Sequence, residues 1–166
     1  MPLNILSADI YTRGDNVALD VFRVNDLRGR AVTNEREMAL VESTLRRALE
    51  SEALDLSALL EQARKKGRSL PVADLEFPSH VSIDNQADPY FTLIEIQTPD
   101  RIGLLHDLLQ CFSRNEIDIA LARISTESGA AIDTFYVTDH RLHSKLTGTQ
   151  RLNALHNELH GAAFRT

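Results

Sequence analysis

This chain of 166 residues has little cysteine, no long apolar run and no excess of positive charge. Its single cysteine, Cys111, excludes a disulfide within the chain and fits a reducing compartment. No apolar stretch approaches the length of a membrane span, and the first residues lack the layout of a signal peptide. The formal net charge of -6 argues against nucleic-acid binding, because such proteins present a basic face to the phosphates. We therefore expect a cytoplasmic protein that binds neither nucleic acid nor a membrane.

Signatures of catalysis are also missing. The sequence contains neither a Gly-Ser nucleotide loop with its acidic pair nor a His-Asp motif of metal-dependent hydrolases. Cys111 has no base near it in the sequence, which favours a small packed residue over a nucleophile. His156 and His160 are four residues apart, but the acid between them is misplaced for an HExxH zinc site. We expect no catalytic residue, no cofactor, no metal and no enzymatic activity of this chain on its own.

The most informative stretch, Tyr90 to Phe112, predicts a strand, a tight turn and a helix in immediate succession. Period-two alternation indicates the strand, which stops at Pro99, and apolar residues at helical spacing indicate the helix. Asp100 stands where a helix N-cap is expected, and Gly103 falls in the first turn, where a missing side chain lets another molecule approach the backbone. Free amides and the positive end of the helix dipole could then hold a carboxylate. The alternative is a capped helix start whose glycine serves packing.

An internal repeat relates the two ends of the chain. Residues 5–24 predict a β-hairpin, which returns from residue 119 onward with Ile5 aligned to Ile119 and Phe22 to Phe135. An amphipathic helix follows each hairpin. The second copy is preceded by the strand and helix of residues 90–115, whereas the first copy has no such elements before it. We therefore expect one partial and one complete copy.

This repeat divides the chain into four segments. We expect a partial first domain at 1–50, a helical connector and linker at 51–79, a strand at 80–89 that completes the first domain, and a second domain at 90–166. The first hairpin is left with an unpaired strand edge, which readily recruits another strand. It is expected to pair with the sheet of the complete domain, with Val81–Asn85, or with a second chain in a dimer.

The motif DRIGLL at residues 100–105, together with D-x-F-x-V at 133–137, resembles the ACT domain. The tandem order of the elements is similar to the C-terminal ACT pair of bacterial PII-protein uridylyltransferases. This resemblance covers nearly the whole chain and implies an α+β fold: ferredoxin-like βαββαβ sandwiches with antiparallel sheets and helices on one face. It also implies an amino-acid-sensing regulatory module, with glutamine as the ligand and nitrogen regulation as the context. The catalytic motifs of such an enzyme are absent from these residues.

The resemblance also implies a binding site between domains. Asp100 would cap the helix, the amides around Ile102–Leu105 would take a carboxylate, and Arg101 would either steer the anion or be solvated. A neighbouring domain's strand would form the other wall. The full predicted set is Asp100, Arg101, Ile102, Gly103, Leu104, Leu105, Asp118, Ile119 and Ala120.

Two other predictions concern buried charge and partners. Asp133 and its counterpart Asp20 lie on the face of Phe135 and Phe22, where we expect a structural partner for each carboxylate rather than catalysis. The expected partners are a small amino acid and a second copy, bound through sheet or helix pairing. The rival hypotheses are an ACT-type interaction or oligomerisation module without a small ligand and, less favoured, an enzyme in its own right.

Overall fold

The computed structural model describes residues 3–15, 17–26, 28–50, 57–66 and 79–164. The expected linker at 67–78 and the start of the connector therefore lie outside the described residues. In chain order the elements are β1 (Leu3–Thr12), β2 (Ala18–Asp26), α1 (Glu35–Glu50), α2 (Ser57–Lys66), β3 (His80–Asp84), β4 (Thr92–Pro99), α3 (Leu104–Arg114), β5 (Ile117–Glu127), β6 (Ala130–Asp139) and α4 (Thr149–Ala163).

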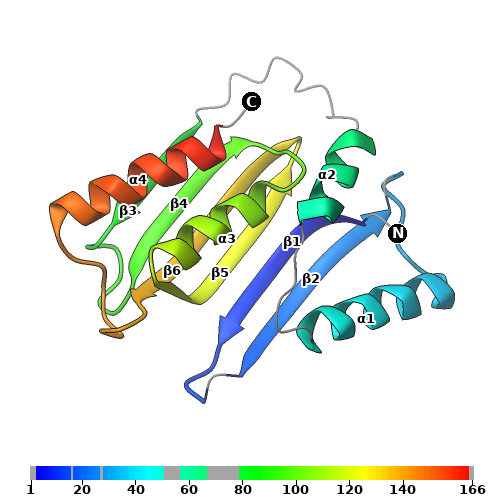
Figure 1. Cartoon of the computed structure of the whole chain (residues 1–166), viewed down its shortest axis with the longest axis horizontal. Coiled ribbons are helices and arrows are strands. Elements are labelled where there is room, and N and C mark those ends of the chain that lie inside the picture. Colours follow the sequence, from blue (N-terminus) through cyan, green and yellow to red (C-terminus); the bar gives the residue numbers. More distant parts are fainter. Residues whose placement is uncertain (1–2, 16, 27, 51–56, 67–78, 165–166) are drawn as a thin grey trace.

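The six strands form one antiparallel sheet in the order β2-β1-β5-β6-β4-β3. Helices α3 and α4 pack against one face of this sheet (Figure 1). The prediction of an α+β fold with an antiparallel sheet is confirmed, and the arrangement is compatible with a ferredoxin-like fold. The division into one partial and one complete βαββαβ copy stays a prediction.

The core lies between α3, α4 and the strands beneath them. Phe112 of α3 and Phe135 of β6 meet edge-on, with ring centroids 4.9 Å apart, and both are fully buried. Cys111 is buried beside them, in keeping with a packed residue. Of the buried hydrophobic residues that the structure describes, all but Ala8 lie between Val81 and Ala163. The second part of the chain therefore carries nearly all of the packed interior.

The first hairpin joins the sheet of the second part. β1 pairs with β5, and Ala8 on the inner strand is 1% exposed. Of the three partners expected for the hairpin, the structure shows the complete domain's sheet. Asp9 lies directly opposite Arg123, the residue that the repeat places at the same position in the second copy.

The short strand β3 corrects a sequence-based expectation. The strand at 80–89 was expected to complete the first copy, but β3, which covers His80–Asp84, pairs with β4 at the edge farthest from the hairpin. Val81 is buried there, and its carbonyl lies 3.1 Å from Nε2 of His156 on α4. In this position β3 contacts both the edge of β4 and helix α4. The second part thus receives its outer strand from the chain that precedes it.

The first part of the chain is comparatively open. Asn34 caps the start of α1 by accepting a hydrogen bond from the N–H of Arg36, yet no residue of α1 is buried. Phe22 is 46% exposed, whereas its repeat counterpart Phe135 is fully buried. Within the described chain, β2 pairs on one side only.

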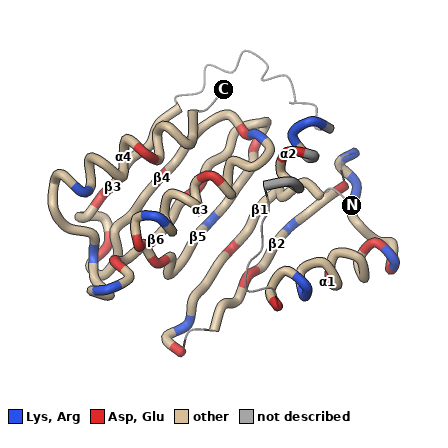
Figure 2. The backbone as a smooth tube through the Cα atoms, viewed as in Figure 1, with Lys and Arg blue, Asp and Glu red and all other residues tan. Residues whose placement is uncertain are grey.

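Acidic and basic residues are interspersed along the strands and helices, in line with the modest formal net charge of -6 (Figure 2). None of the helices in the described ranges has the length and apolar character needed to cross a membrane.

Candidate ligand-binding site

The loop between β4 and α3 is a tight turn built around Gly103. The N–H of Leu104 donates to the carbonyl of Arg101 over 3.1 Å, and Gly103 has φ 82° and ψ 8°, the geometry of the third position of a type II turn. A side chain is strained at this φ, so the turn requires glycine. The predicted N-cap is therefore wrong: α3 begins at Leu104 with Gly103 as its N-cap and no side-chain cap. Asp100 stands before this extra turn, too far from the helix start to cap it.

The helix start offers amides toward the turn. The first hydrogen bond that enters α3 runs from the N–H of Asp107 to the carbonyl of Gly103 over 3.0 Å. The N–H groups of Leu105 and His106 precede that bond and so have no acceptor within the helix. Together with the helix dipole they form a place where an anion is favoured.

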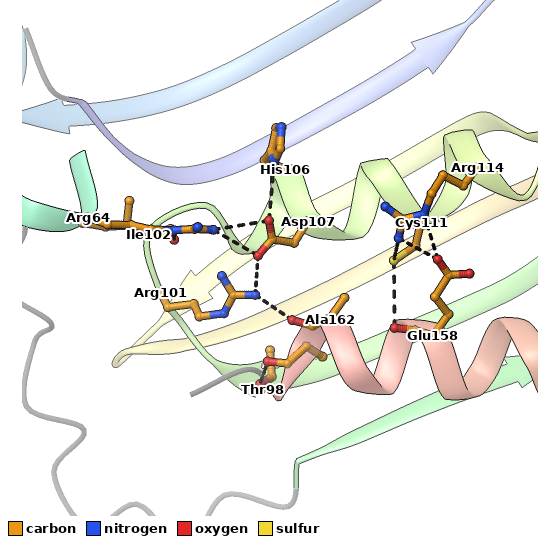
Figure 3. A network of polar contacts seen from close by, with 11 residues as sticks. Arg64, Thr98, Arg101, Ile102, His106, Asp107, Cys111, Arg114, Glu158 and Ala162 are labelled. Carbon is orange, nitrogen blue, oxygen red and sulfur yellow. Dashed lines mark hydrogen bonds and ion pairs between the residues drawn. The ribbon is translucent and has the colours of Figure 1, made fainter. Parts of the chain in front are cut away.

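Arg101 holds the turn onto the end of α4. Its guanidinium donates to the Asp107 carboxylate over 2.7 Å and to the carbonyl of Ala162 over 2.6 Å (Figure 3). A cation at the C-terminus of α4 is also favourable for that helix's dipole. Arg101 is thus neither simply solvated nor free to steer a ligand. Its Nε is buried and has no hydrogen-bond partner among the described residues.

Asp100 and Asp133 form a second polar feature at this end of the sheet. The N–H of Asp100 donates to the carbonyl of Gly129 over 2.8 Å, which ties the loop to the β5–β6 turn. Desolvation raises the pKa of the Asp100 carboxyl, although the residue lies at the surface. Burial is the main reason why the pKa of Asp133 is raised to about 7. The charge of Asp100 raises this pKa further, whereas a hydrogen bond from the Ser125 backbone lowers it. The structural partner expected for Asp133 is incomplete, since its Oδ1 has no partner among the described residues.

The connector helix α2 covers the turn. A Cβ atom built on Gly103 would lie 3.0 Å from Nη2 of Arg64 and 3.2 Å from Cδ2 of Leu60. Arg64 reaches Asp107 at 3.2 and 3.3 Å and the carbonyl of Ile102 at 3.5 Å (Figure 3). Burial raises the pKa of Asp107, but the bonds from Arg101 and His106 and the charges of Arg101 and Arg64 outweigh it and lower the pKa overall.

Sequence reasoning missed the role of α2. In the sequence, the run Arg64-Lys65-Lys66 indicates only positive charge suited to a helix C-terminus. A helix that precedes a long linker carries no signal for where it docks, so only the folded chain reveals this contact.

The two predicted halves of the site do not meet within the chain. Asp100–Leu105 lies at the start of α3, and Asp118–Ala120 follows its end, about 16 Å away along a helix of 11 residues. Asp118 pairs with Nδ1 of His140 at 2.9 Å and lines a groove of about 830 Å³ that also contains Thr12 of β1. The residues that share an end of the sheet with the turn are instead those at the start of β1, because Ser7 pairs with Ser125 near the end of β5.

Comparison with known proteins agrees with this architecture. A family model described as an ACR9-like, ACT-like domain matches residues 80–165, which is half of the chain. The chain belongs to the ACT-like family. The match begins at β3, the strand that the structure assigns to the second part of the sheet.

Relatives of this ACT-like chain carry the name bifunctional uridylyltransferase/uridylyl-removing enzyme. The protein from Cereibacter sphaeroides is 35% identical over 145 residues, covering 86% of the chain. Those from Gluconobacter oxydans and Zymomonas mobilis are each 35% identical over 94% and 96% of the chain. The chain spans only 15 to 17% of the length of these three relatives. It is therefore an ACT-like regulatory domain homologous to a segment of that enzyme. No solved structure matches it.

Proposed function

We propose that this ACT-like chain senses a free amino acid, with glutamine as the ligand, and serves as the regulatory region of a bifunctional uridylyltransferase/uridylyl-removing enzyme in nitrogen regulation. The observation that carries the proposal is the turn at Gly103, whose positive φ presents the first amides of α3 as a carboxylate site. The unpaired Nε of Arg101 adds a buried donor beside the same turn. The name that these relatives share supplies the enzymatic context.

The hairpin and the second part of the sheet are, in this proposal, a tandem pair related by an approximate two-fold axis. The pairing of β1 with β5 supports this, since Ser7 faces Ser125 and Tyr11 faces Leu121. In the repeat, Ser7 corresponds to Leu121 and Tyr11 to Ser125, so the two pairs exchange equivalent positions. Asp9 and Arg123 stand at the centre.

This symmetry suggests where the second wall of the site lies. The repeat counterpart of Asp118–Ala120 is Asn4–Leu6 at the start of β1, the end of the sheet that holds the turn at Gly103. An amino acid held there would touch both halves of the pair. It would shift the equilibrium between two arrangements by the difference in its affinity for them.

Calorimetric titration tests the proposal. We expect L-glutamine to bind and its decarboxylated analogue, which lacks the group that the α3 amides would hold, to bind at least about tenfold more weakly. The reason is that a hydrogen bond to a charged group contributes about 1.5–3 kcal/mol. L-Glutamate and L-alanine in the same series report on the side-chain pocket. Equal binding of glutamine and the analogue would show that the α3 amides do not hold the ligand carboxylate.

The second candidate function is an interaction module without a small ligand. The exposed apolar side chains of β2 and α1 favour it, because exposed apolar surface often marks a protein contact. Absence of heat with every amino acid, together with concentration-dependent association, would support this reading over the first.

A further inference from the structure

We propose that α2 is a built-in cover of the amino-acid site, which the ligand must displace in order to bind. This inference rests on the proposed function and adds a mechanism of regulation to it. It follows from where α2 sits, from how weakly it is held there, and from what its removal would leave behind.

The first observation is the lack of space between α2 and the turn. Arg64 and Leu60 lie where the side chain of residue 103 would begin. A Cβ atom built on Gly103 would be 3.0 Å from Arg64 and 3.2 Å from Leu60. On the side of Gly103 where a Cβ would lie, a ligand carboxylate cannot approach the backbone while both side chains remain in place. In the arrangement that the structure shows, this approach to the turn is occupied by the chain itself.

The second observation is that the closure is weak. The side chain of Arg64 is 47% exposed, and its bonds to Asp107, at 3.2 and 3.3 Å, are long for a charged pair. Because the Arg64 side chain is half exposed, solvent screens its pair with Asp107 and reduces the contribution of that pair to stability. Arg64 also brings a positive charge to the positive end of α3, where an anion is preferred.

The third observation concerns what remains when α2 leaves. Asp107 keeps its shorter bond of 2.7 Å to Arg101, which does not belong to α2. Release of Arg64 therefore leaves no buried carboxylate without a cation. An incoming carboxylate would gain the amides of α3 in exchange for the contacts of Arg64 with Asp107 and Ile102 and of Leu60 with the turn.

A cover of this kind lowers the apparent affinity by the fraction of molecules in which the site is open. Because α2 lies in the connector between α1 and β3, its release also changes how the two parts of the chain are linked. The conformational effect of ligand binding would thereby be transmitted through the connector rather than through the sheet.

The test compares Arg64→Ala, and the double variant Leu60→Ala/Arg64→Ala, with the full chain by titration with L-glutamine. We expect both variants to bind more tightly, by roughly three- to tenfold, because the open fraction rises when the weak pair is lost. Lys65→Ala is the matched control: it removes a cation from the same helix, but Lys65 is exposed and, among the described residues, its ion pair is with Glu61 of α2, at 3.8 Å. Its affinity should equal that of the parent.

Hydrogen exchange of the peptide that spans 57–66 supplies an independent readout. In the parent protein, saturating L-glutamine should speed exchange there, and Arg64→Ala should do so without ligand. Unchanged or weaker binding by the variants, or unchanged exchange at saturation, would overturn the cover while leaving glutamine binding intact. If the parent protein itself does not bind L-glutamine, the proposed function is wrong, and so is the covering role of α2.

Discussion

At the scale of single residues, the least expected feature is that the buried carboxyl of Asp133 lacks a complete set of partners among the described residues. Asp133 lies on a central strand, is 2% exposed, and has an oxygen with no partner among the described residues. Its pKa in the folded chain, about 7, is above its usual value of 3.8. The folded state therefore binds a proton that the unfolded state has already released between these values. Stability from this group is fully present below about pH 3.8 and is lost as the pH rises to about 7.

Asp133→Asn tests this linkage. The parent should lose roughly 4 kcal/mol of unfolding free energy between pH 4 and pH 8 through this group, and the variant should lose none through it. Urea denaturation at a series of pH values measures the difference between the two slopes, to which the titrating groups that do not interact with Asp133 contribute equally. Parallel curves would show that the carboxyl finds a partner or water in solution.

Residues of the turn show how far sequence reasoning reaches. The motif located the turn and its glycine, because Asp, Gly and the apolar spacing of the helix are all visible in the sequence. It placed Gly103 inside the helix, whereas the positive φ shows that this residue precedes the helix. The bonds of Arg101 to Asp107 and Ala162 could not be predicted, since α4 comes near the turn only after the whole sheet has formed.

At the scale of elements, local patterns predicted each strand and helix well, but not each partner. The hairpin, the β4–α3 unit and both amphipathic helices appear where periodicity indicated them. Strand β3 was assigned to the first copy because it follows that copy's helix in the chain. Pairing depends on which edge and which helix face offer more burial, and these are properties of the folded sheet rather than of the order of segments.

The concentration of the core in one part of the chain leads to a prediction for a fragment. Residues 80–166 contain β3 through α4 and every buried hydrophobic residue described except Ala8, so we expect them to fold without the hairpin and the connector. Loss of β1 exposes the edge of β5, and the fragment should self-associate weakly through it. Circular dichroism and sedimentation velocity measure the two properties. A fragment without a cooperative melt would show that the hairpin is needed for folding.

On the scale of the whole molecule, one half is covered and the other is open. The outer edge of β2 is free within the described chain, and Leu19 and Val21 on that strand are 58% and 51% exposed. Apolar side chains of α1 are similarly exposed. A free strand edge beside apolar surface readily recruits another strand. This arrangement agrees with the sequence-based expectation of a homodimer, which stays a prediction.

Val21→Lys should weaken this association. A lysine on an edge strand disfavours edge-to-edge pairing, because the incoming strand would have to bury or displace its charge. We expect a concentration-dependent shift in sedimentation for the parent and a loss of that shift in the variant. Leu142→Lys is the control, since Leu142 is 66% exposed but lies outside the strands. Equal behaviour of all three proteins would locate the contact elsewhere or show that the chain is a monomer.

The pairing of Asp9 with Arg123 has a consequence for the choice of partner. If two copies of β5 met about the same axis, Arg123 would face another Arg123, and two copies of β1 would set Asp9 against Asp9. Like charges directly opposite each other in neighbouring strands are destabilising, whereas opposite charges are favourable. The same repeated position is an acid in β1 and a base in β5. Pairing of β1 with β5 is therefore more favourable than pairing of either strand with a second copy of itself. The chain is in this way directed to close its central seam internally, which leaves the outer edges of β2 and β3 as the strand edges that are free within the described chain.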